Sequence, residues 1–212
     1  MRSKRADDFF SEADRVKIRE AVATVERQTA GEVAVMVVNE SDRYLEAVTL
    51  GALFLAAGTA LVVALAIHQV SIWLYLPLVF ATYFPARYLV LRFPHLKLAF
   101  VGRRRFAEAV RDRAVRAFFE KRLHKTRHET GILIFISLFE RRVWILGDGG
   151  INAKIPSDWW EQCALELAAG IREGRSRESL CTVIEKCGAE LKKHFPLPGD
   201  DSNELPNEIL LE

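Results

Sequence analysis

The sequence has few cysteines, and their number and spacing argue against a disulfide-stabilised fold. There are three in 212 residues, Cys163, Cys181 and Cys187. An odd number without metal-like spacing fits a reducing compartment. We expect these residues to pack in the core rather than to act as reactive thiols. A cleavable signal sequence is not expected either, because no apolar core follows the basic start of residues 1–10.

Motifs for phosphate chemistry are also missing. The sequence has no Cys-x₅-Arg loop, no glycine-rich phosphate loop ending in Lys-Ser or Lys-Thr, and no Asp-x-Asp pair. His124, His128 and His194 stand apart from one another, and His95 follows Pro94 next to an apolar stretch. The sequence therefore identifies no catalytic residue.

One stretch without charged residues is longer than is usual for a helix of a soluble protein. Residues 47–67 carry no charged side chain and would be apolar on every side of a helix. A helix rises about 1.5 Å per residue, so one of this length would cross the hydrocarbon core of a bilayer, which is about 30 Å thick. The stretch predicts a transmembrane helix. The alternative is a helix buried in a large soluble core, but such helices normally have one polar face.

A second apolar stretch follows after four residues. Residues 72–91 are apolar except for Arg87, and they contain Pro77 and Pro85. Neighbouring groups can satisfy the backbone around a proline inside a membrane, and an arginine near the end of a span can reach the headgroups. So short a connection requires an antiparallel hairpin, and the prolines predict a kink in its second helix. The polar segments before and after the hairpin would then lie on the same side of the membrane.

Basic residues flank the hairpin, whereas the turn between its helices has none. The positive-inside rule therefore places the turn outside and both termini in the cytoplasm, in a cell inner membrane that the chain spans twice. Basic side chains beside a membrane attract anionic lipid headgroups. The residues expected at the membrane surface are Arg92, Lys97, Arg103, Arg104 and Arg105.

The segment after the hairpin is strongly basic, although the whole chain has a net charge of only +2. Residues 103–127 contain ten Lys or Arg and three acidic residues. Beside a membrane this composition favours anionic headgroups or an acidic partner protein. Nucleic acid is the competing interpretation of such a cluster, and we do not expect it as a partner here. A solvated helix face would give the same composition without a specific partner.

The polar segments on both sides of the hairpin repeat one order of helix, glycine and strand. Ser11 and Asp14 form a capping-box pattern before the first helix. Strands that lack polar alternation are buried on both faces, and repeated helix–strand units favour parallel neighbouring strands. The expected elements are a helix after Ser11, a strand at 33–38, a helix at 103–125, strands at 132–137 and 142–146, and helices from Pro156 and Ser176.

The fold class that follows is an α/β (α+β) sandwich. It would have a small mixed sheet with helices on both faces, interrupted by the two-helix transmembrane hairpin. The expected boundaries are residues 1–44 for the first part of the domain, 45–92 for the hairpin, 93–195 for the second part and 196–212 for a disordered acidic tail.

Short motifs at the ends of these elements resemble the TPM domain family. The resemblance covers about residues 9–39 and 103–194, and it implies a small α/β sandwich of this type. Many family members carry a terminal signal or anchor, so the hairpin inserted after the first strand is a departure from the pattern. The matching motifs are Ser11-Glu12-Ala13-Asp14, Thr29-Ala30-Gly31-Glu32, Thr130-Gly131-Ile132-Leu133-Ile134, Glu140-Arg141-Arg142-Val143 and Gly147-Asp148-Gly149-Gly150-Ile151.

Oxygen-bearing side chains are expected to converge at one edge of the sheet. Such ligands suit a hard cation such as Mg²⁺ or Ca²⁺. The resemblance implies divalent-cation binding near the strand ends and the acid-phosphatase activity of a plant branch of the family. The same residues have simpler roles as a helix cap, a turn residue or solvated carboxylates. The candidate ligands are Asp148, Asp158, Asn152, Glu32 and Glu129.

Two functions remain open from the sequence. The first is a membrane-tethered binding or assembly module on the cytoplasmic face, with another membrane protein as its partner. A complete α/β domain, an intramembrane insertion and a basic segment beside the membrane favour it. The second is a divalent-cation-dependent phosphatase anchored to the membrane, which the family resemblance alone implies.

Overall fold

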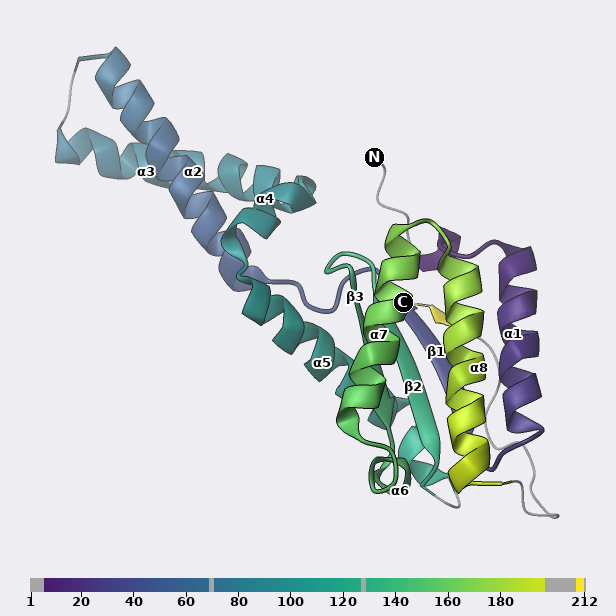
Figure 1. Ribbon diagram of the computed structural model, residues 1–212. Helices are drawn as coiled ribbons and strands as arrows, with labels where there is room; N and C mark the ends of the chain where they lie inside the picture. Colours follow the sequence, from purple (N-terminus) through teal and green to yellow (C-terminus); the bar gives the residue numbers. More distant parts are fainter. Residues whose placement is uncertain (1–5, 69–70, 127–128, 197–208, 212) are drawn as a thin grey trace. The chain divides into compact units, whose positions relative to one another are not determined.

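The computed structural model describes residues 6–68, 71–126, 129–196 and 209–211 (Figure 1). The chain forms two compact units. The α/β unit contains residues 1–42 and 107–212, and the helical unit contains residues 43–106. An inserted segment therefore separates the two parts of the α/β unit in the sequence. The helical unit continues to Phe106, beyond residue 92, where the sequence analysis ended the hairpin.

The α/β unit is built on a four-stranded sheet in the order β3-β2-β1-β4. Its strands are β1 (Glu32–Val38), β2 (Gly131–Ser137), β3 (Arg142–Gly147) and β4 (Leu210–Leu211). β1 and β2 are parallel, and their register runs from Glu32 opposite Gly131 to Val38 opposite Ser137. β3 is antiparallel to β2, and β4 is parallel to β1. The mixed α/β sheet predicted from the sequence is confirmed.

Helices cover both faces of this sheet. On one face, Val33, Val35 and Val37 of β1 pack with buried residues of α1, α7 and α8, which Figure 1 shows side by side. On the other face, Met36 and Val38 pack with α5. Successive side chains of a strand point to opposite faces, so a strand that is apolar throughout needs cover on both. The helices are α1 (Glu12–Glu26), α5 (Arg103–Glu120), α7 (Ser157–Arg172) and α8 (Ser176–His194).

The glycine at the start of each central strand, Gly31 just before β1 and Gly131 as the first residue of β2, marks a close approach of two chain segments. A Cβ atom on Gly131 would lie 2.3 Å from the carbonyl oxygen of Leu123, which begins the 3₁₀ helix η2 (Leu123–Lys125). Only glycine fits at this distance without moving the backbone. The hydroxyl of Thr130 donates a hydrogen bond to the Ala30 carbonyl at 2.6 Å. The two junctions that are similar in sequence therefore lie side by side in the sheet.

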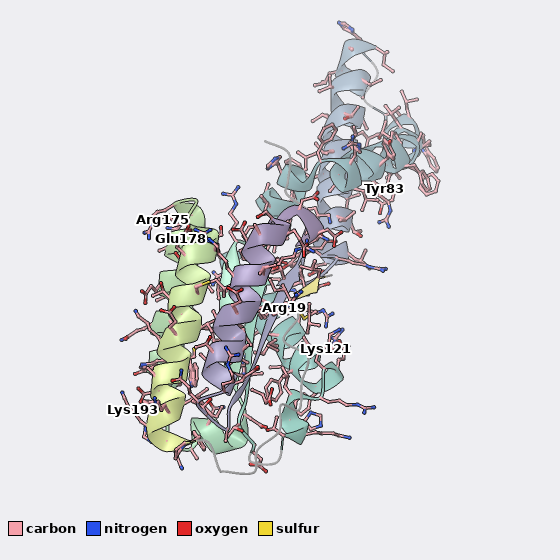
Figure 2. The ribbon with its side chains drawn as sticks, turned by 90° about the vertical axis from the view of Figure 1, so that its right-hand side faces the viewer. Arg19, Tyr83, Lys121, Arg175, Glu178 and Lys193 are labelled. Carbon is pink, nitrogen blue, oxygen red and sulfur yellow. The ribbon has the colours of Figure 1, made fainter. Side chains whose placement is uncertain are left out.

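The first turn of α1 and both ends of α8 carry charges that the helix dipole favours. Ser11 Oγ accepts a hydrogen bond from the Asp14 N–H, and the Asp14 carboxylate accepts one from the Ser11 N–H, each at 3.2 Å. This is the predicted capping box. In α8, Glu178 lies in the first turn and Lys193 in the last, at opposite ends of the helix (Figure 2). Both positions are favourable in the field of the helix.

The helical unit contains two long helices and a short one. They are α2 (Leu45–Ala66), α3 (Ile72–Arg92) and α4 (Pro94–Phe100). α2 and α3 pack through small side chains, among them the buried Ala56 and Ala86. Thr82 Oγ1 of α3 donates to the Ala56 carbonyl of α2 at 3.2 Å. α3 continues through Pro77 and Pro85, and the predicted kink stays a prediction.

The chain end differs most from the sequence analysis. Residues 196–212 were expected to be a disordered tail, but Leu210 and Leu211 form β4 beside Met36 and Val37 of β1. The apolar run that forms β4 is too short to predict a strand by its pattern. Residues 197–208 lie outside the described residues. The basic helix is also shorter than expected, since α5 ends at Glu120.

Candidate functional site

The edge of the sheet where β1 and β2 begin holds three of the predicted cation ligands. Glu32 lies there, opposite Gly131. The backbone N–H of Asp148, which follows β3, donates to the Gly131 carbonyl at 2.9 Å. Glu129 precedes β2, and its Oε2 lies 3.5 Å from the position that a Cβ on Gly149 would take. The structure thus brings Glu32, Glu129 and Asp148 to one edge.

The side chains of Asp148 and Asn152 form hydrogen bonds with nearby backbone groups. Asp148 is the N-cap of the short helix α6 (Gly149–Asn152), and its Oδ1 accepts from the Gly149 N–H at 2.7 Å. The second carboxylate oxygen, Oδ2, is buried and has no hydrogen-bond partner among the described residues. Asn152 Nδ2 donates to the Gly147 carbonyl at 2.6 Å, which closes the turn after β3. Asp148 therefore keeps one oxygen for a further ligand.

Asp158 has a different role from the other predicted ligands. It is exposed in the first turn of α7, where its carboxylate accepts from the Ser157 hydroxyl at 3.4 Å. A negative charge there stabilises the helix start. In the part of the chain that the structure describes, no three His, Cys, Asp or Glu side chains are grouped as metal ligands. Among the predicted carboxylates, Asp148 precedes Gly149 in the chain and Glu129 lies beside it in space.

The opposite edge of the sheet, where β1 and β2 end, holds a second polar cluster. The hydroxyl of Ser41 donates to Ser137 Oγ at 2.9 Å, and the Ser137 hydroxyl donates to the Glu140 carboxylate. Ser137 is 1% exposed and Glu140 is 9% exposed. Ligands of open α/β sheets commonly bind beyond the carboxyl ends of parallel strands. Here the polar groups bind one another, so the cluster fixes the exit of β1 against the turn between β2 and β3.

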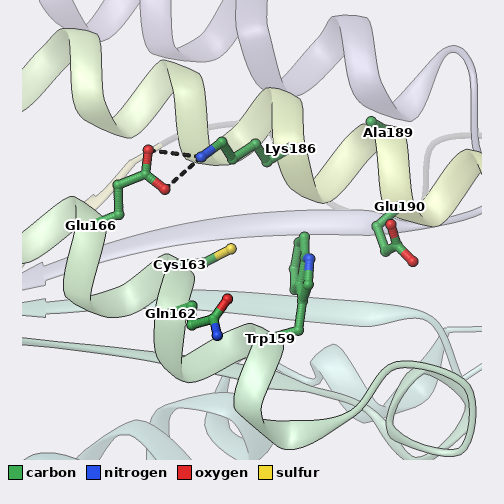
Figure 3. A pocket seen from close by; sticks show the side chains of 7 residues that line it. All are labelled: Trp159, Gln162, Cys163, Glu166, Lys186, Ala189 and Glu190. Carbon is green, nitrogen blue, oxygen red and sulfur yellow. Dashed lines mark hydrogen bonds and ion pairs between the residues drawn. The ribbon is translucent and has the colours of Figure 1, made fainter.

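An open groove of about 300 Å³ lies between α7 and α8 (Figure 3). Trp159 and Cys163 line it from α7. At one side, Lys186 Nζ of α8 binds both carboxylate oxygens of Glu166 at 2.8 and 2.5 Å. This hydrogen bonding raises the pKa of Lys186. The pair is exposed to solvent and contributes little to stability. The groove is therefore lined by an aromatic ring, a buried thiol and an ion pair closed on itself.

The helical unit exposes apolar side chains along both long helices. α2 and α3, with 22 and 21 residues, are long and apolar enough to cross a membrane. Within the structure, 33% of the most apolar stretch of α2 and 11% of that of α3 is buried. Phe54, Trp73 and Phe80 are 70%, 87% and 70% exposed. Large apolar side chains of this kind are normally buried when a helix belongs to a soluble core.

The basic residues predicted at the membrane surface differ in exposure. Arg92 and Arg104 are exposed, whereas Lys97 is only 7% exposed. The side chain of Arg103 lies outside the described residues. Arg92 and Arg104 are therefore better placed than Lys97 to meet an anionic headgroup.

Arg105, the fifth of these residues, is held inside the helical unit. Its Nε lies 3.0 Å from Glu46 Oε1, at the start of α2. Its guanidinium carbon lies 5.7 Å from the centre of the Tyr44 ring. The ion pair and the cation–π contact tie the beginning of α5 to the beginning of α2. Arg105 therefore contacts residues at the start of α2 within the helical unit.

The cysteines pack as the sequence analysis expected. Cys163 and Cys187 belong to the core cluster of the α/β unit, with 4% and 0% of their surface exposed. Cys181 is half-buried next to the same cluster. Burial raises the pKa of all three thiols. Protonated, buried thiols are poor nucleophiles.

The fold defines a mixed α/β domain with an inserted pair of long apolar helices. Comparison with solved structures finds one of similar fold, the NMR structure of the BA42 protein from the psychrophilic bacterium Bizionia argentinensis. The two share 21% sequence identity with a TM-score of 0.61, and the alignment covers 96% of each chain. At this identity the similarity shows the fold alone. No family model matches the chain, and no curated protein matches it.

Sequence reasoning missed the cluster of Ser41, Ser137 and Glu140. The sequence analysis named Glu140 only within a motif of the family resemblance and gave its side chain no role. A carboxylate in so short a connection between two buried strands was the available signal, because a charge there needs hydrogen bonds. Ser41 lies 96 residues before Ser137, so no local sequence pattern could predict the hydrogen bond between them.

Proposed function

We propose that this chain is an integral membrane protein in which the α2–α3 hairpin anchors the α/β unit. One observation carries the proposal: most of the apolar surface of both helices faces outward, with 33% and 11% of their most apolar stretches buried. In water this surface would be costly, at roughly 25 cal/mol for each Å² of apolar area. In a bilayer it is the favourable arrangement.

The contacts between α2 and α3 also suit a membrane environment. Helices in lipid associate through small residues and interhelical hydrogen bonds, since the lipid is as apolar as the side chains. Ala52, Ala56 and Ala86 form the buried contact between the two helices. Tyr75 and Thr82 donate from α3 to carbonyls of α2, each at 3.2 Å. A soluble helix pair would instead be expected to bury its large side chains.

We infer that the α/β unit lies on the cytoplasmic side, together with both termini. Arg43 precedes α2, Arg87 and Arg92 lie near the end of α3, and Arg104 follows it, whereas residues 67–71 contain no Lys or Arg. The positive-inside rule then gives two spans with the turn outside. Arg92 and Arg104 are the exposed side chains that would meet anionic headgroups.

The proposed role of the anchored domain is that of a TPM-type binding or assembly module. The motifs around Gly31, Gly131 and Asp148 support the TPM-type assignment, together with a mixed sheet between helices. A binding role is favoured because the Ser41–Ser137–Glu140 cluster and the Glu166–Lys186 pair are closed by their own hydrogen bonds. A second membrane protein is the partner that a domain held at the bilayer surface would meet most often.

Membrane insertion is tested with two matched substitutions. Phe54 and Leu165 are large apolar residues that are 70% and 64% exposed, on α2 and α7 respectively. Phe54→Arg should move the protein from the carbonate-resistant membrane pellet toward the soluble or degraded fraction, because a charge near the middle of a span costs roughly 2.5–3.5 kcal/mol on insertion scales. Leu165→Arg should leave the fractionation unchanged. Equal behaviour of the two variants, or wild type in the soluble fraction, would contradict the proposal.

Orientation and assembly need separate measurements. Tags at residues 1 and 212 should be accessible from the cytoplasm, and a tag at residue 69 from outside the cell. Tags at the two termini that report from opposite sides would exclude the arrangement. For the module, crosslinking and affinity purification should recover a recurrent membrane protein. A set of proteins no different from that of an unrelated hairpin protein would contradict the binding role.

A divalent-cation-dependent phosphatase is the second candidate, and one observation favours it. Asp148 Oδ2 is buried without a hydrogen-bond partner in the described structure, and the Glu129 carboxylate lies near the adjacent Gly149. Two carboxylates would supply part of the oxygen shell of Mg²⁺ or Ca²⁺, with water completing it. In detergent, calorimetry should show cation binding that Asp148→Asn and Glu129→Gln abolish and that Glu161→Gln retains. Unaltered binding in the first two variants, or no phosphoester hydrolysis with either cation, would remove this candidate.

A further inference from the structure

β3 forms one margin of the sheet. In the order β3-β2-β1-β4, its only partner strand among the described residues is β2. The interior of β3 is apolar, with Arg142 at its start and Asp148 directly after its end. An apolar strand at an open edge is a template for pairing with another chain. The outer edge of β3 is therefore an interaction surface whose two ends carry opposite charges.

Alternate backbone groups of β3 point away from β2. In an antiparallel ladder, residues that exchange hydrogen bonds with the neighbouring strand alternate with residues whose N–H and C=O point outward. The Asp148 N–H donates to the Gly131 carbonyl at 2.9 Å, which fixes this alternation. Counting back from Asp148 in steps of two, the even-numbered residues of β3 bond to β2. The outward groups are those of Val143, Ile145 and Gly147.

These outward groups are available for a further strand. In the described part of the chain, no backbone hydrogen bond joins Val143 or Ile145 to a segment other than β2. The Gly147 carbonyl accepts from Asn152 Nδ2 at 2.6 Å. A carbonyl oxygen has two lone pairs, so this bond leaves one for another donor.

The charges at the ends of β3 are placed symmetrically about Ile145. Arg142 lies three residues before Ile145, and Asp148 lies three residues after it. When two β3 strands run antiparallel with Ile145 opposite Ile145, Arg142 of each copy lies opposite Asp148 of the other. Opposite charges in such positions attract, and like charges repel. A register with Trp144 opposite Trp144 would instead place Glu140 opposite Asp148, so the charges select the register centred on Ile145.

The same register suits both faces of the sheet. Val143 and Ile145 pack on the side of α1, α7 and α8, whereas Trp144 and Leu146 pack on the α5 side, where both are half-buried. A two-fold axis perpendicular to the sheet joins like faces of the two copies. Trp144 of each copy then covers Leu146 of the other. The outward backbone groups also meet, Ile145 with Ile145 and Val143 with Gly147.

We propose that the outer edge of β3 is a strand-addition surface for β3 of a second copy, antiparallel and with Ile145 on the two-fold axis. Such a self-complementary surface is that of an isologous dimer. Backbone hydrogen bonds supply the attraction in strand addition, and the pairs of Arg142 with Asp148 set the register. The second copy is the occupant because it carries both charges at the required spacing. All these residues lie in the α/β unit, so the inference does not rest on the proposed membrane function.

A charge exchange between full-length chains with two different tags tests this register in detergent. Wild-type chain on an affinity resin should retain wild-type chain that carries the second tag. Arg142→Glu and Asp148→Lys should each weaken self-retention about tenfold, because both charge pairs of the dimer become repulsive. A mixture of these two variants should be retained like wild type, since each pair again joins opposite charges. Arg141→Glu is the control, because this exposed neighbour faces the uncharged Gly149 in the same register.

Val143→Pro provides a second variant that keeps the charges. Proline removes an outward N–H and leaves the bonds to β2 in place, as it does on natural edge strands. Self-retention should weaken by a similar factor. Near-UV circular dichroism establishes that each variant is folded. In wild type, hydrogen exchange at single-residue resolution should slow at Ile145 as the protein concentration rises, whereas Trp144, bonded to β2, should be protected at every concentration.

Three results would overturn the proposal. The first is a wild-type chain that does not retain itself. The second is retention of folded Arg142→Glu and Val143→Pro at the wild-type level, which would place the contact elsewhere. The third is failure of folded Arg142→Glu and Asp148→Lys to retain one another, which would contradict the register. If Asp148→Lys does not fold, the comparison of Arg142→Glu with Arg141→Glu, together with Val143→Pro, decides.

Discussion

The backbone N–H of Ser41 donates a hydrogen bond of 2.9 Å to Glu140 Oε1, across a sequence separation of 99 residues. Ser41 follows β1 just before the inserted helical unit, and Glu140 lies in the turn between β2 and β3. The second oxygen of Glu140 accepts from the Ser137 hydroxyl. The Glu140 carboxylate therefore links the segment after β1, where the inserted helical unit begins, to the turn between β2 and β3.

Replacing Glu140 should destabilise the α/β unit. Glu140→Ala leaves the Ser41 N–H and the Ser137 hydroxyl without their acceptor in a largely buried site. An unsatisfied buried polar group costs about 1–3 kcal/mol, so the free energy of unfolding should fall by about that amount. Urea unfolding of the full chain in detergent, followed by tryptophan fluorescence, measures the change. Glu161→Ala, at an exposed site on α7, should change it by less than about 0.5 kcal/mol.

Gly131 should tolerate no side chain, because the Leu123 carbonyl oxygen would lie 2.3 Å from an added Cβ. Relief of that overlap requires the backbone of η2 or β2 to move, and overpacking of this kind costs about 1–3 kcal/mol. Gly131→Ala should therefore lower the thermal unfolding temperature. Gly149→Ala, whose Cβ would meet Glu129 at an ordinary 3.5 Å, should leave it nearly unchanged. Similar unfolding temperatures for the two variants would show that the close approach at Gly131 is unimportant.

Much of the fold was predictable because its signals are local. The Ser11–Asp14 capping box, the apolar strands at β1 and β2 and the glycine before each strand all act within a few residues. β4 was missed because its stability comes from contacts with β1, far away in the sequence. A strand of only two or three residues that forms by pairing with an existing strand edge has no sequence pattern of its own, so it cannot be predicted locally.

The candidate site was predictable only in part. Glu129 and Asp148 meet at one sheet edge because strand topology brings the start of β2 beside the end of β3. Asp158 was expected at the same edge, and the structure places it in the first turn of α7, after helix α6. The hydrogen bond from Asn152 to the Gly147 carbonyl depends on the side-chain conformation, which cannot be predicted from the sequence pattern.

The cysteines should react with thiol reagents in the order of their exposure. Cys187 is fully buried, Cys163 is 4% exposed and Cys181 is half-buried. Because burial raises the pKa of each thiol, the reactive thiolate is scarce at neutral pH and increases as the pH rises. Folded protein at neutral pH should release colour from Ellman's reagent slowly, with Cys181 first, and protein in denaturant should react at all three. Cys181→Ser should remove the first phase, and a fast phase that remained would contradict the order.

The capping box at α1 should give the protein a pH-dependent increment of stability. A hydrogen bond from the Ser11 hydroxyl, the main cause, holds the pKa of Asp14 below its usual value of 3.8. A lowered folded-state pKa means that the ionised carboxylate stabilises the fold above the unfolded pKa, and that this contribution disappears as the pH falls through the folded pKa. Ser11→Ala should therefore cost about 0.5–2 kcal/mol at pH 7, and the difference from wild type should shrink below the usual value of 3.8. Urea midpoints at pH 7 and pH 3 measure it, with Thr182→Ala on the exposed side of α8 as a control whose effect should not vary with pH. A Ser11→Ala difference that stayed constant over this range would show that the charge of Asp14 does not contribute to the cap.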